Sequence, residues 1–202
     1  MDELLYYFAN KEDASYVMPN TVKIIPEEAF CDHEYLTSVT LSENLEYIPS
    51  GAFDGSLITS IVIPASVTEI ASSAFQSSEL SSIEFAEGGK LSAIGEEAFY
   101  YTQLESVDLP AGIKTIGECA FGSCDQLLWA RIPEGVTSLS GDCFIWCDLL
   151  ETVYLPDSIT YISDRALQDC PNLKSIRLPA NLSRLGSALS FCILSISVIL
   201  LV

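Results

Sequence analysis

Basic residues are scarce in this sequence. Nine Lys and Arg residues stand against 28 Asp and Glu residues, and the formal net charge is −19 at pH 7. Nucleic acids and anionic lipid surfaces both attract proteins through clustered Lys and Arg side chains. The composition therefore argues against nucleic acid and against an anionic membrane surface as partners. The few basic residues lie mainly in the second half, because residues 1–100 hold only Lys11, Lys23 and Lys90.

Catalytic signatures are also missing. His33 is the single histidine, so the usual general base is scarce. The chain has no Gly-rich phosphate loop, nucleophile elbow, zinc-binding His pair or calcium loop. Acidic pairs such as Glu27-Glu28 and Glu96-Glu97 could perform acid–base chemistry, but they recur at one repeat position and are better interpreted as solvated residues. We therefore predict that the protein is not an enzyme and needs no metal or cofactor.

Neither end carries a clear targeting or membrane-spanning segment. The N-terminus begins Met-Asp-Glu-Leu-Leu and lacks the basic region, apolar run and cleavage site of a signal peptide. Residues 191–202 are apolar but too short to cross a bilayer as a helix. They can be interpreted as a degenerate terminal repeat, with Val198-Ile199-Leu200 as a strand, or as an anchor. Membrane anchoring stays open, as do a longer parent chain, another export route and an intracellular location.

A repeat of about 22 to 24 residues runs along most of the chain. Each unit reads Leu-x-x-Val/Ile-x-Leu-Pro-x-x-Val-x-x-Ile-x-x-x-Ala-Phe-x-x-Cys. One unit cannot bury its own apolar residues, so the units must stack into a solenoid. The Ala-Phe dipeptide and its blurred copies lie at Ala29-Phe30, Ala52-Phe53, Ala74-Phe75, Ala98-Phe99, Ala120-Phe121, Cys143-Phe144 and Ala166-Leu167.

The pattern within each unit predicts its local structure. Alternating apolar and variable residues before the Leu-Pro position predict one short strand per unit, and stacked units place these strands side by side and parallel. The Phe and Ile positions then form buried columns. Acidic residues leading into Ala-Phe favour a short helical turn on the opposite side. We predict about eight turns, with a lead-in over 1–13, a solenoid over 14–185 and a degenerate repeat or apolar tail over 186–202.

These units resemble the BspA-type leucine-rich repeat. The resemblance rests on Leu-Pro after the strand and on Ala-Phe-x-x-Cys in the turn, and it covers about residues 14 to 185. The fourth unit resembles the longer variant of that family, since two residues are inserted near Gly88-Gly89. The resemblance implies a leucine-rich repeat solenoid at the cell surface or outside the cell.

The same resemblance implies a non-enzymatic protein-binding or adhesion module. Its partner would be a protein such as a host matrix or surface protein, and we expect the chain itself to be a monomer. A carbohydrate-binding surface and a structural spacer in a larger surface protein are the alternatives, because fold alone does not choose among these functions.

Four of the seven cysteines occupy the same position of the repeat. Free cysteine is often buried, and stacked parallel side chains resist the dihedral angle of a disulfide. The spacing of about 23 residues also matches no zinc-ligand pattern. We therefore predict a column of small buried side chains with unpaired thiols. The column consists of His33, Ser56, Ser78, Thr102, Cys124, Cys147, Cys170 and Cys192.

Residue types typical of binding hot spots cluster at outward positions of the predicted sheet. One of the two outward positions of each strand holds Ser or Thr in most units, and Trp129 breaks this row. The other outward position holds Arg131, Tyr154 and Arg177 on the same strand and the next two. The flanking arginines favour a protein partner that carries acidic groups. The predicted site residues are Trp129, Arg131, Tyr154, Arg177, Asp108 and Glu84.

Two other interpretations concern the aromatic residues. Trp129 could instead cover a packing defect left by the small Ala130 in the same strand. A second aromatic set follows the Phe column at Tyr100, Tyr101, Ile145 and Trp146, and it is interpreted as packing at the end of each turn.

Overall fold

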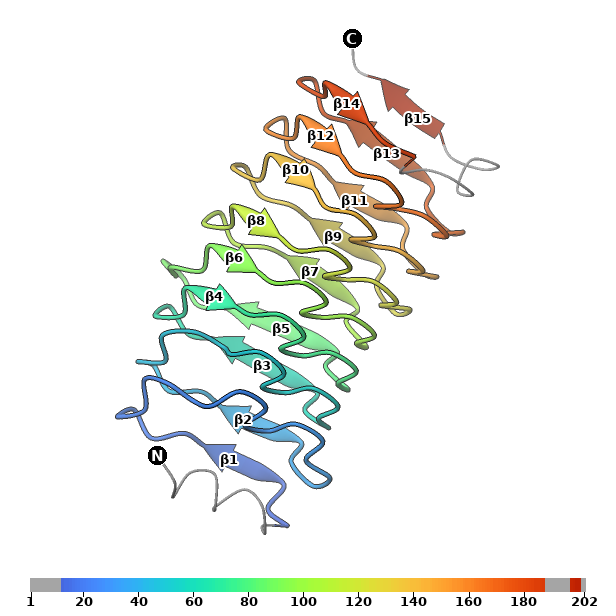
Figure 1. The fold of residues 1–202 in the computed structure, drawn as a ribbon. Helices are drawn as coiled ribbons and strands as arrows, with labels where there is room; N and C mark the ends of the chain where they lie inside the picture. The colour runs from blue at the N-terminus through green and yellow to red at the C-terminus, as the bar shows by residue number, and fades with distance from the viewer. Residues whose placement is uncertain (1–11, 188–196, 201–202) are drawn as a thin grey trace.

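The computed structural model describes residues 12–187 and the strand at 197–200. Its turns stack along one axis into an elongated solenoid, with β1 and β15 at opposite ends (Figure 1). Eight main strands from β1 to β13 bound seven complete turns, one fewer than the sequence predicts. The main strands are β1 (Ser15–Val17), β2 (Ser38–Thr40), β3 (Ser60–Ile63), β5 (Ser82–Phe85), β7 (Ser106–Asp108), β9 (Trp129–Arg131), β11 (Thr152–Tyr154), β13 (Ser175–Leu178) and β15 (Ser197–Leu200).

Main strands of neighbouring turns pair in parallel, as predicted. They form the groups β1–β2, β3–β5, β7–β9–β11 and β13–β15. The register places like positions opposite one another, for example Ser106 opposite Trp129 and Trp129 opposite Thr152. β15 covers Val198-Ile199-Leu200, where the sequence analysis placed a strand, and it pairs with β13.

A second row of strands lies at the Ile column, and the sequence analysis missed it. Each has only two residues, which is too short to display a period of two along the chain. They pair in parallel as β4–β6–β8 and β10–β12–β14, and a bridge between Ile48 and Ile70 extends the row. These short strands are β4 (Glu69–Ile70), β6 (Ala93–Ile94), β8 (Thr115–Ile116), β10 (Ser138–Leu139), β12 (Tyr161–Ile162) and β14 (Arg184–Leu185).

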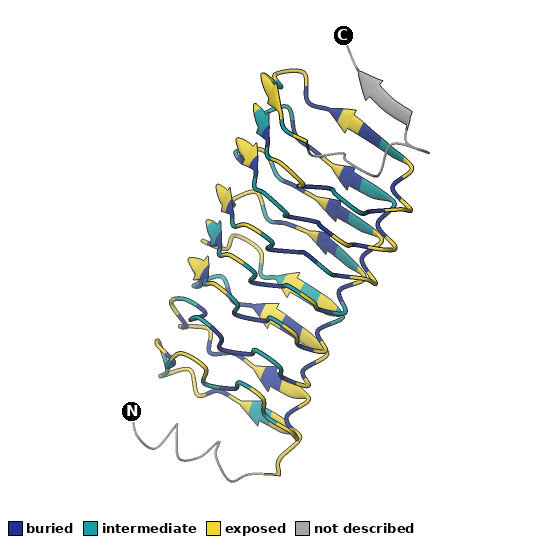
Figure 2. Ribbon diagram, turned by 45° about the vertical axis from the view of Figure 1, so that its right-hand side comes forward, coloured by how far each residue is buried: buried dark blue, intermediate teal, exposed yellow. Residues whose placement is uncertain are grey.

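Burial alternates along the main strands, so one face points to the core and the other to solvent (Figure 2). In β3, Ile61 and Ile63 are buried, whereas Ser60 and Val62 are exposed. This alternation is the period of two expected of a strand with one buried face. The predicted inward and outward positions are therefore correct.

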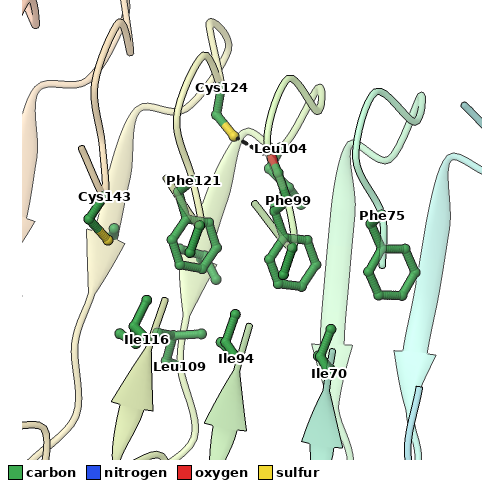
Figure 3. Close-up of a cluster of buried hydrophobic side chains, with 14 of the residues drawn as sticks. Ile70, Phe75, Ile94, Phe99, Leu104, Leu109, Ile116, Phe121, Cys124 and Cys143 are labelled. Atoms are coloured by element: carbon green, nitrogen blue, oxygen red, sulfur yellow. Dashed lines mark hydrogen bonds between the residues drawn. The ribbon is translucent and has the colours of Figure 1, made fainter. Parts of the chain in front are cut away.

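The Phe residues form a continuous stack inside the solenoid (Figure 3). Successive ring centroids from Phe30 to Phe144 lie 4.8–5.4 Å apart, and the rings are within 11° of parallel. Each ring is at most 1% exposed. The Ile column runs beside it through Ile70, Ile94 and Ile116 (Figure 3). Both columns confirm the predicted stacking of like positions.

The predicted helical turn is wrong: the described residues contain no helix. Instead, two residues per turn adopt positive φ, such as Glu97 and Tyr101, one before Ala-Phe and one two places after it. The N–H of Phe75 donates to the carbonyl of Ala98 in the next turn, at 2.8 Å, and the other turns repeat this bond. Donors used between turns cannot make the bonds four residues back that an α-helix requires. Accordingly, the described part of the chain offers no helix long and apolar enough to cross a membrane.

The column of small side chains is buried, as predicted, from Ser56 to Cys170. The Ser78 and Thr102 hydroxyls donate to the Phe carbonyl of their own turn. The Cys124 thiol instead donates to the Phe99 carbonyl one turn earlier, at 3.1 Å, and Cys147 and Cys170 repeat this pattern. All six cysteines of the described chain are free thiols. Cys192 lies outside the described residues.

Candidate binding site on the outer face of the main strands

The outer face carries the side chains of the main strands that point away from the core. From β2 to β7 it presents Ser, Thr, Val, Glu and Asp residues only. β9 and β11 depart from this pattern, because they present Trp129 and Arg131, then Thr152 and Tyr154. Large aromatic side chains therefore lie at one place on an otherwise small and polar surface.

Trp129, Arg131 and Tyr154 contact one another across two neighbouring strands; we call them the aromatic cluster. The Trp129 and Tyr154 rings meet edge to face, with centroids 6.4 Å apart and planes at 74°. The Arg131 Cζ atom lies 5.4 Å from the Tyr154 centroid and 6.0 Å from the Trp129 centroid. The register brings them together, since Arg131 is opposite Tyr154. Such cation–π contacts stabilise the arrangement by about 0.5–1 kcal/mol each at exposed positions.

Asp108 adds a carboxylate from the third strand of this group. The register sets it opposite Arg131, and the Arg131 Nη1 atom donates to Asp108 Oδ2 at 3.3 Å. Both side chains are 55% exposed, so this ion pair contributes little to stability. Its effect is to orient the guanidinium of Arg131 and to neutralise its charge locally.

Arg177 is held by a different partner one strand further along. Its Nη2 atom donates to Asp157 Oδ1 at 3.0 Å, and the backbone N–H of Ala180 donates to the same oxygen. The Ala180 hydrogen bond and then the Arg177 charge lower the pKa of Asp157. The sequence analysis missed Asp157, although a Pro-Asp pair directly after a strand marks a turn from which a side chain can accept hydrogen bonds.

The expectation of an acidic partner loses its basis in this geometry. That expectation assumed that the positive charges of Arg131 and Arg177 face a partner. Each guanidinium instead meets an aspartate of this chain, Asp108 or Asp157. Lys174 and Arg165 are likewise paired, with Glu151 and Asp142.

Glu84 and Trp129 line one hollow of the outer face, where the paired strands are interrupted between β5 and β7. Ile83 and Phe85 line it too and are half-buried, whereas the equivalent Val107 is only 2% exposed. The unit that joins β5 to β7 is two residues longer than the unit that joins β3 to β5. The sequence showed this insertion, but it did not predict that Ile83 and Phe85 beside it would be only half-buried.

Trp129 does not fill the space beside Ala130. Successive side chains of a strand point to opposite faces. Ala130 is fully buried on the core side, whereas Trp129 is half-buried on the outer side. The packing-defect interpretation of Trp129 therefore fails, and its contacts with Tyr154 and Arg131 account for its position.

The second aromatic set lies in the turns that follow Ala-Phe. Only Tyr100 and Ile145, two of its four members, are packing residues. Ile145 is 3% exposed, and the space above Gly122 is filled by the Tyr100 ring and Ile145. Tyr101 and Trp146, however, are 55% and 49% exposed, and both have positive φ. These two rings are thus surface residues rather than packing residues.

Two half-buried thiols, Cys31 and Cys119, lie beside carboxylates in the turns around Ala-Phe. Burial and then the charge of Asp142 raise the pKa of Cys119 to about 11, and burial and Asp32 do the same for Cys31. Such thiols stay protonated at neutral pH and are poor nucleophiles. Over the described residues, no three His, Cys, Asp or Glu side chains are placed to hold one metal ion.

Stacked parallel strands around Phe, Ile and Leu columns define a leucine-rich repeat solenoid with one open sheet face. The model of the BspA type leucine rich repeat region matches residues 5–127 and 92–200, in six copies. The chain therefore belongs to the BspA-type leucine-rich repeat family. No curated protein matches the sequence.

Solved structures of bacterial leucine-rich repeat proteins share this fold. A leucine-rich repeat protein from Bacteroides ovatus is 30% identical with a TM-score of 0.77, and the alignment covers 86% of this chain and 45% of that one. A leucine rich cell surface protein from Faecalibacterium prausnitzii is 28% identical with a TM-score of 0.67, over 92% and 48%. The T. pallidum Leucine Rich Repeat protein is 26% identical with a TM-score of 0.63, over 87% and 74%. The chain thus spans less than half the length of the first two.

Proposed function

We propose that this chain is a non-enzymatic protein-binding module of the adhesion type. The observation that carries the proposal is the aromatic cluster on the open outer face. Trp, Tyr and Arg are the residue types enriched at binding hot spots. Trp129, Arg131 and Tyr154 already hold one another in place, so a partner would have less side-chain entropy to remove.

The family and its solved relatives support a location at the cell surface or outside the cell. The relative from F. prausnitzii is described as a cell surface protein. This chain covers less than half of that relative. The partner and the membrane anchoring of this chain are therefore proposed. The partner is a protein such as a host matrix or surface protein, and the module acts as a monomer.

The carbohydrate alternative has less support in the geometry. Sugar rings stack on the open faces of aromatic side chains, and two coplanar rings make a continuous platform. The planes of Trp129 and Tyr154 instead lie at 74°, and the Arg131 guanidinium lies over both rings. A simple spacer would need no such cluster on its surface.

Binding of Trp129→Ala to a panel of purified matrix and bacterial surface proteins tests the proposal. Where the parent chain binds, we expect Trp129→Ala to weaken the affinity by about 2 kcal/mol, which is roughly thirtyfold in Kd. Surface plasmon resonance gives the affinity, and circular dichroism establishes that the variant keeps its fold.

Val17→Ala is the matched control, because Val17 is exposed on the same face in β1, at the end of the solenoid away from Trp129. It should bind like the parent chain. Equal binding by Trp129→Ala and Val17→Ala would contradict the proposed site and move attention to the exposed rings of Tyr101 and Trp146.

A further inference from the structure

The hollowed part of the outer face is acidic. One hollow spans β2, β3 and β5 and is lined by Glu43 and Glu84 among others. A second lies between β5 and β9 and is lined by Glu84, Asp108 and Trp129 among others. Glu84 belongs to both, so the two hollows adjoin one another. The residues that line them, all within the described chain, include three carboxylates and no lysine or arginine.

Two of these carboxylates have no counterion among the residues that the structure describes. Asp108 is paired with Arg131, but within residues 12–187 no lysine or arginine pairs with Glu43 or Glu84. Both side chains belong to exposed residues, so their charge is available to a partner. The surrounding chain reinforces the same sign, with a net charge of −19. A field of this sign raises the association rate of a cationic partner and slows an anionic one.

The same surface offers apolar contacts. Val62 is exposed in the first hollow, and Pro110 and the half-buried Trp129 line the second, which Ile83 and Phe85 border from the core side of β5. An anchor side chain of a partner would remove these groups from water, and burial of apolar surface favours binding. Carboxylates beside an apolar hollow suit a ligand that combines cationic and apolar side chains.

We propose that the groove from β2 to β9 binds a basic segment of a partner protein, in which Lys or Arg residues flank an aromatic or aliphatic anchor. The cationic groups pair with Glu84 and Glu43, and the anchor lies against Trp129 and Pro110. This inference rests on the proposed function, because it names the chemistry of the partner for the same outer face. It replaces the acidic partner that the sequence alone suggested.

Peptide selection on the intact chain tests the inference. The protein is immobilised and a random linear peptide display library is selected on it. We expect the enriched peptides to carry net positive charge with an aromatic or aliphatic residue. Their binding should weaken as salt rises, because exposed charge pairs are screened. Enrichment of acidic or uncharged peptides, or no enrichment, would overturn the inference.

A matched pair of charge variants locates the contact. Glu84→Gln should bind the enriched peptide about threefold more weakly and with a smaller salt dependence. Glu69→Gln removes the same charge from the exposed position of β4, in the row of short strands, and should bind like the parent chain. Equal affinities for the two variants would overturn the assignment of the groove.

Trp129→Ala separates this inference from the proposed function. Acidic peptides that bind the parent chain but not Trp129→Ala would leave the site in place and overturn only the charge of the partner. Peptides of any charge that bind Trp129→Ala as well as the parent chain would overturn the proposed function itself.

Discussion

Phenylalanine at one position of six successive turns forms a buried stack that stabilises this protein. Phe75 and Phe99 are fully buried, and each ring stacks on two others at 5.1–5.3 Å. Phe75→Ala or Phe99→Ala would leave a cavity between two turns that cannot collapse without moving both. We expect a loss of about 3–5 kcal/mol in the free energy of unfolding, measured by urea denaturation. Val62→Ala, on the exposed side of β3, should change it by less than about 0.5 kcal/mol, and equal effects would contradict the stacked core.

The cysteines provide a second prediction at this scale. Burial raises the pKa of Cys124 to about 11 and also raises the pKa of Cys147. A raised thiol pKa keeps the neutral form at pH 7, and the neutral thiol reacts slowly with alkylating reagents. The pKa of Cys31 and Cys119 is raised as well, but these thiols are only half-buried, so we expect native labelling to modify them before the fully buried Cys124 and Cys147. Mass spectrometry of timed samples locates the label, and rapid modification of Cys124 in the folded protein would contradict its buried position.

At the scale of one element, the turn after the Ile column brings two backbones unusually close. A Cβ atom on Gly117 would lie 2.4 Å from the backbone nitrogen of Glu96 and 2.4 Å from the Gly95 carbonyl carbon. Backbone atoms cannot move aside as a flexible side chain can. Gly117→Ala should therefore force neighbouring turns apart and destabilise the protein by about 1–3 kcal/mol, measured by thermal unfolding.

Gly88→Ala is the appropriate comparison for that substitution. Gly88 has a positive φ, but a Cβ atom there meets nothing within 4 Å. Its cost should be limited to the strain of a left-handed residue, about 1 kcal/mol. A smaller loss for Gly117→Ala than for Gly88→Ala would contradict the close approach of the turns.

At the scale of the whole molecule, stacking brings carboxylates of successive turns together. Burial and then the neighbouring charge of Asp32 raise the pKa of Asp54, and burial and Asp148 raise that of Asp125. An acid whose pKa is higher in the folded state disfavours folding while ionised, and this cost disappears as the pH falls through the folded pKa. Asp157 and Asp164 shift in the opposite direction but are exposed at the surface.

We therefore expect stability to rise as the pH is lowered from 7 into the acid range in which these carboxylates protonate. Added salt should stabilise the protein at pH 7 for the same reason, because it screens repulsion within a chain of net charge −19. Thermal melts over pH and NaCl concentration measure both effects. A protein that becomes steadily less stable from pH 7 to 5 would show that its salt bridges outweigh this repulsion.

Several features of the site follow from the sequence alone. A repeat of constant register sets Arg131 opposite Tyr154 and Asp108, so the neighbourhood of these three residues follows from the repeat. The partner of Arg177 was not predicted, because Asp157 belongs to a loop whose direction depends on the turn around Ala180. The half-buried edge at Ile83 and Phe85 was also unforeseen, since it appears where neighbouring strands stop pairing.

The sequence by itself determined the solenoid, its buried columns and its family, because a periodic pattern can bury its apolar residues only by stacking in register. Tertiary structure decided how the turns join. Phe75 donates its N–H to Ala98 of the next turn, so ladders between turns replace the helical turn that acidic residues before Ala-Phe suggested. It also decided the charge of the outer face, because Asp108 and Asp157 neutralise the arginines, while Glu43 and Glu84 stay unpaired among the described residues. A one-dimensional pattern specifies which residues are neighbours, but the direction of each side chain follows from the packed turns around it.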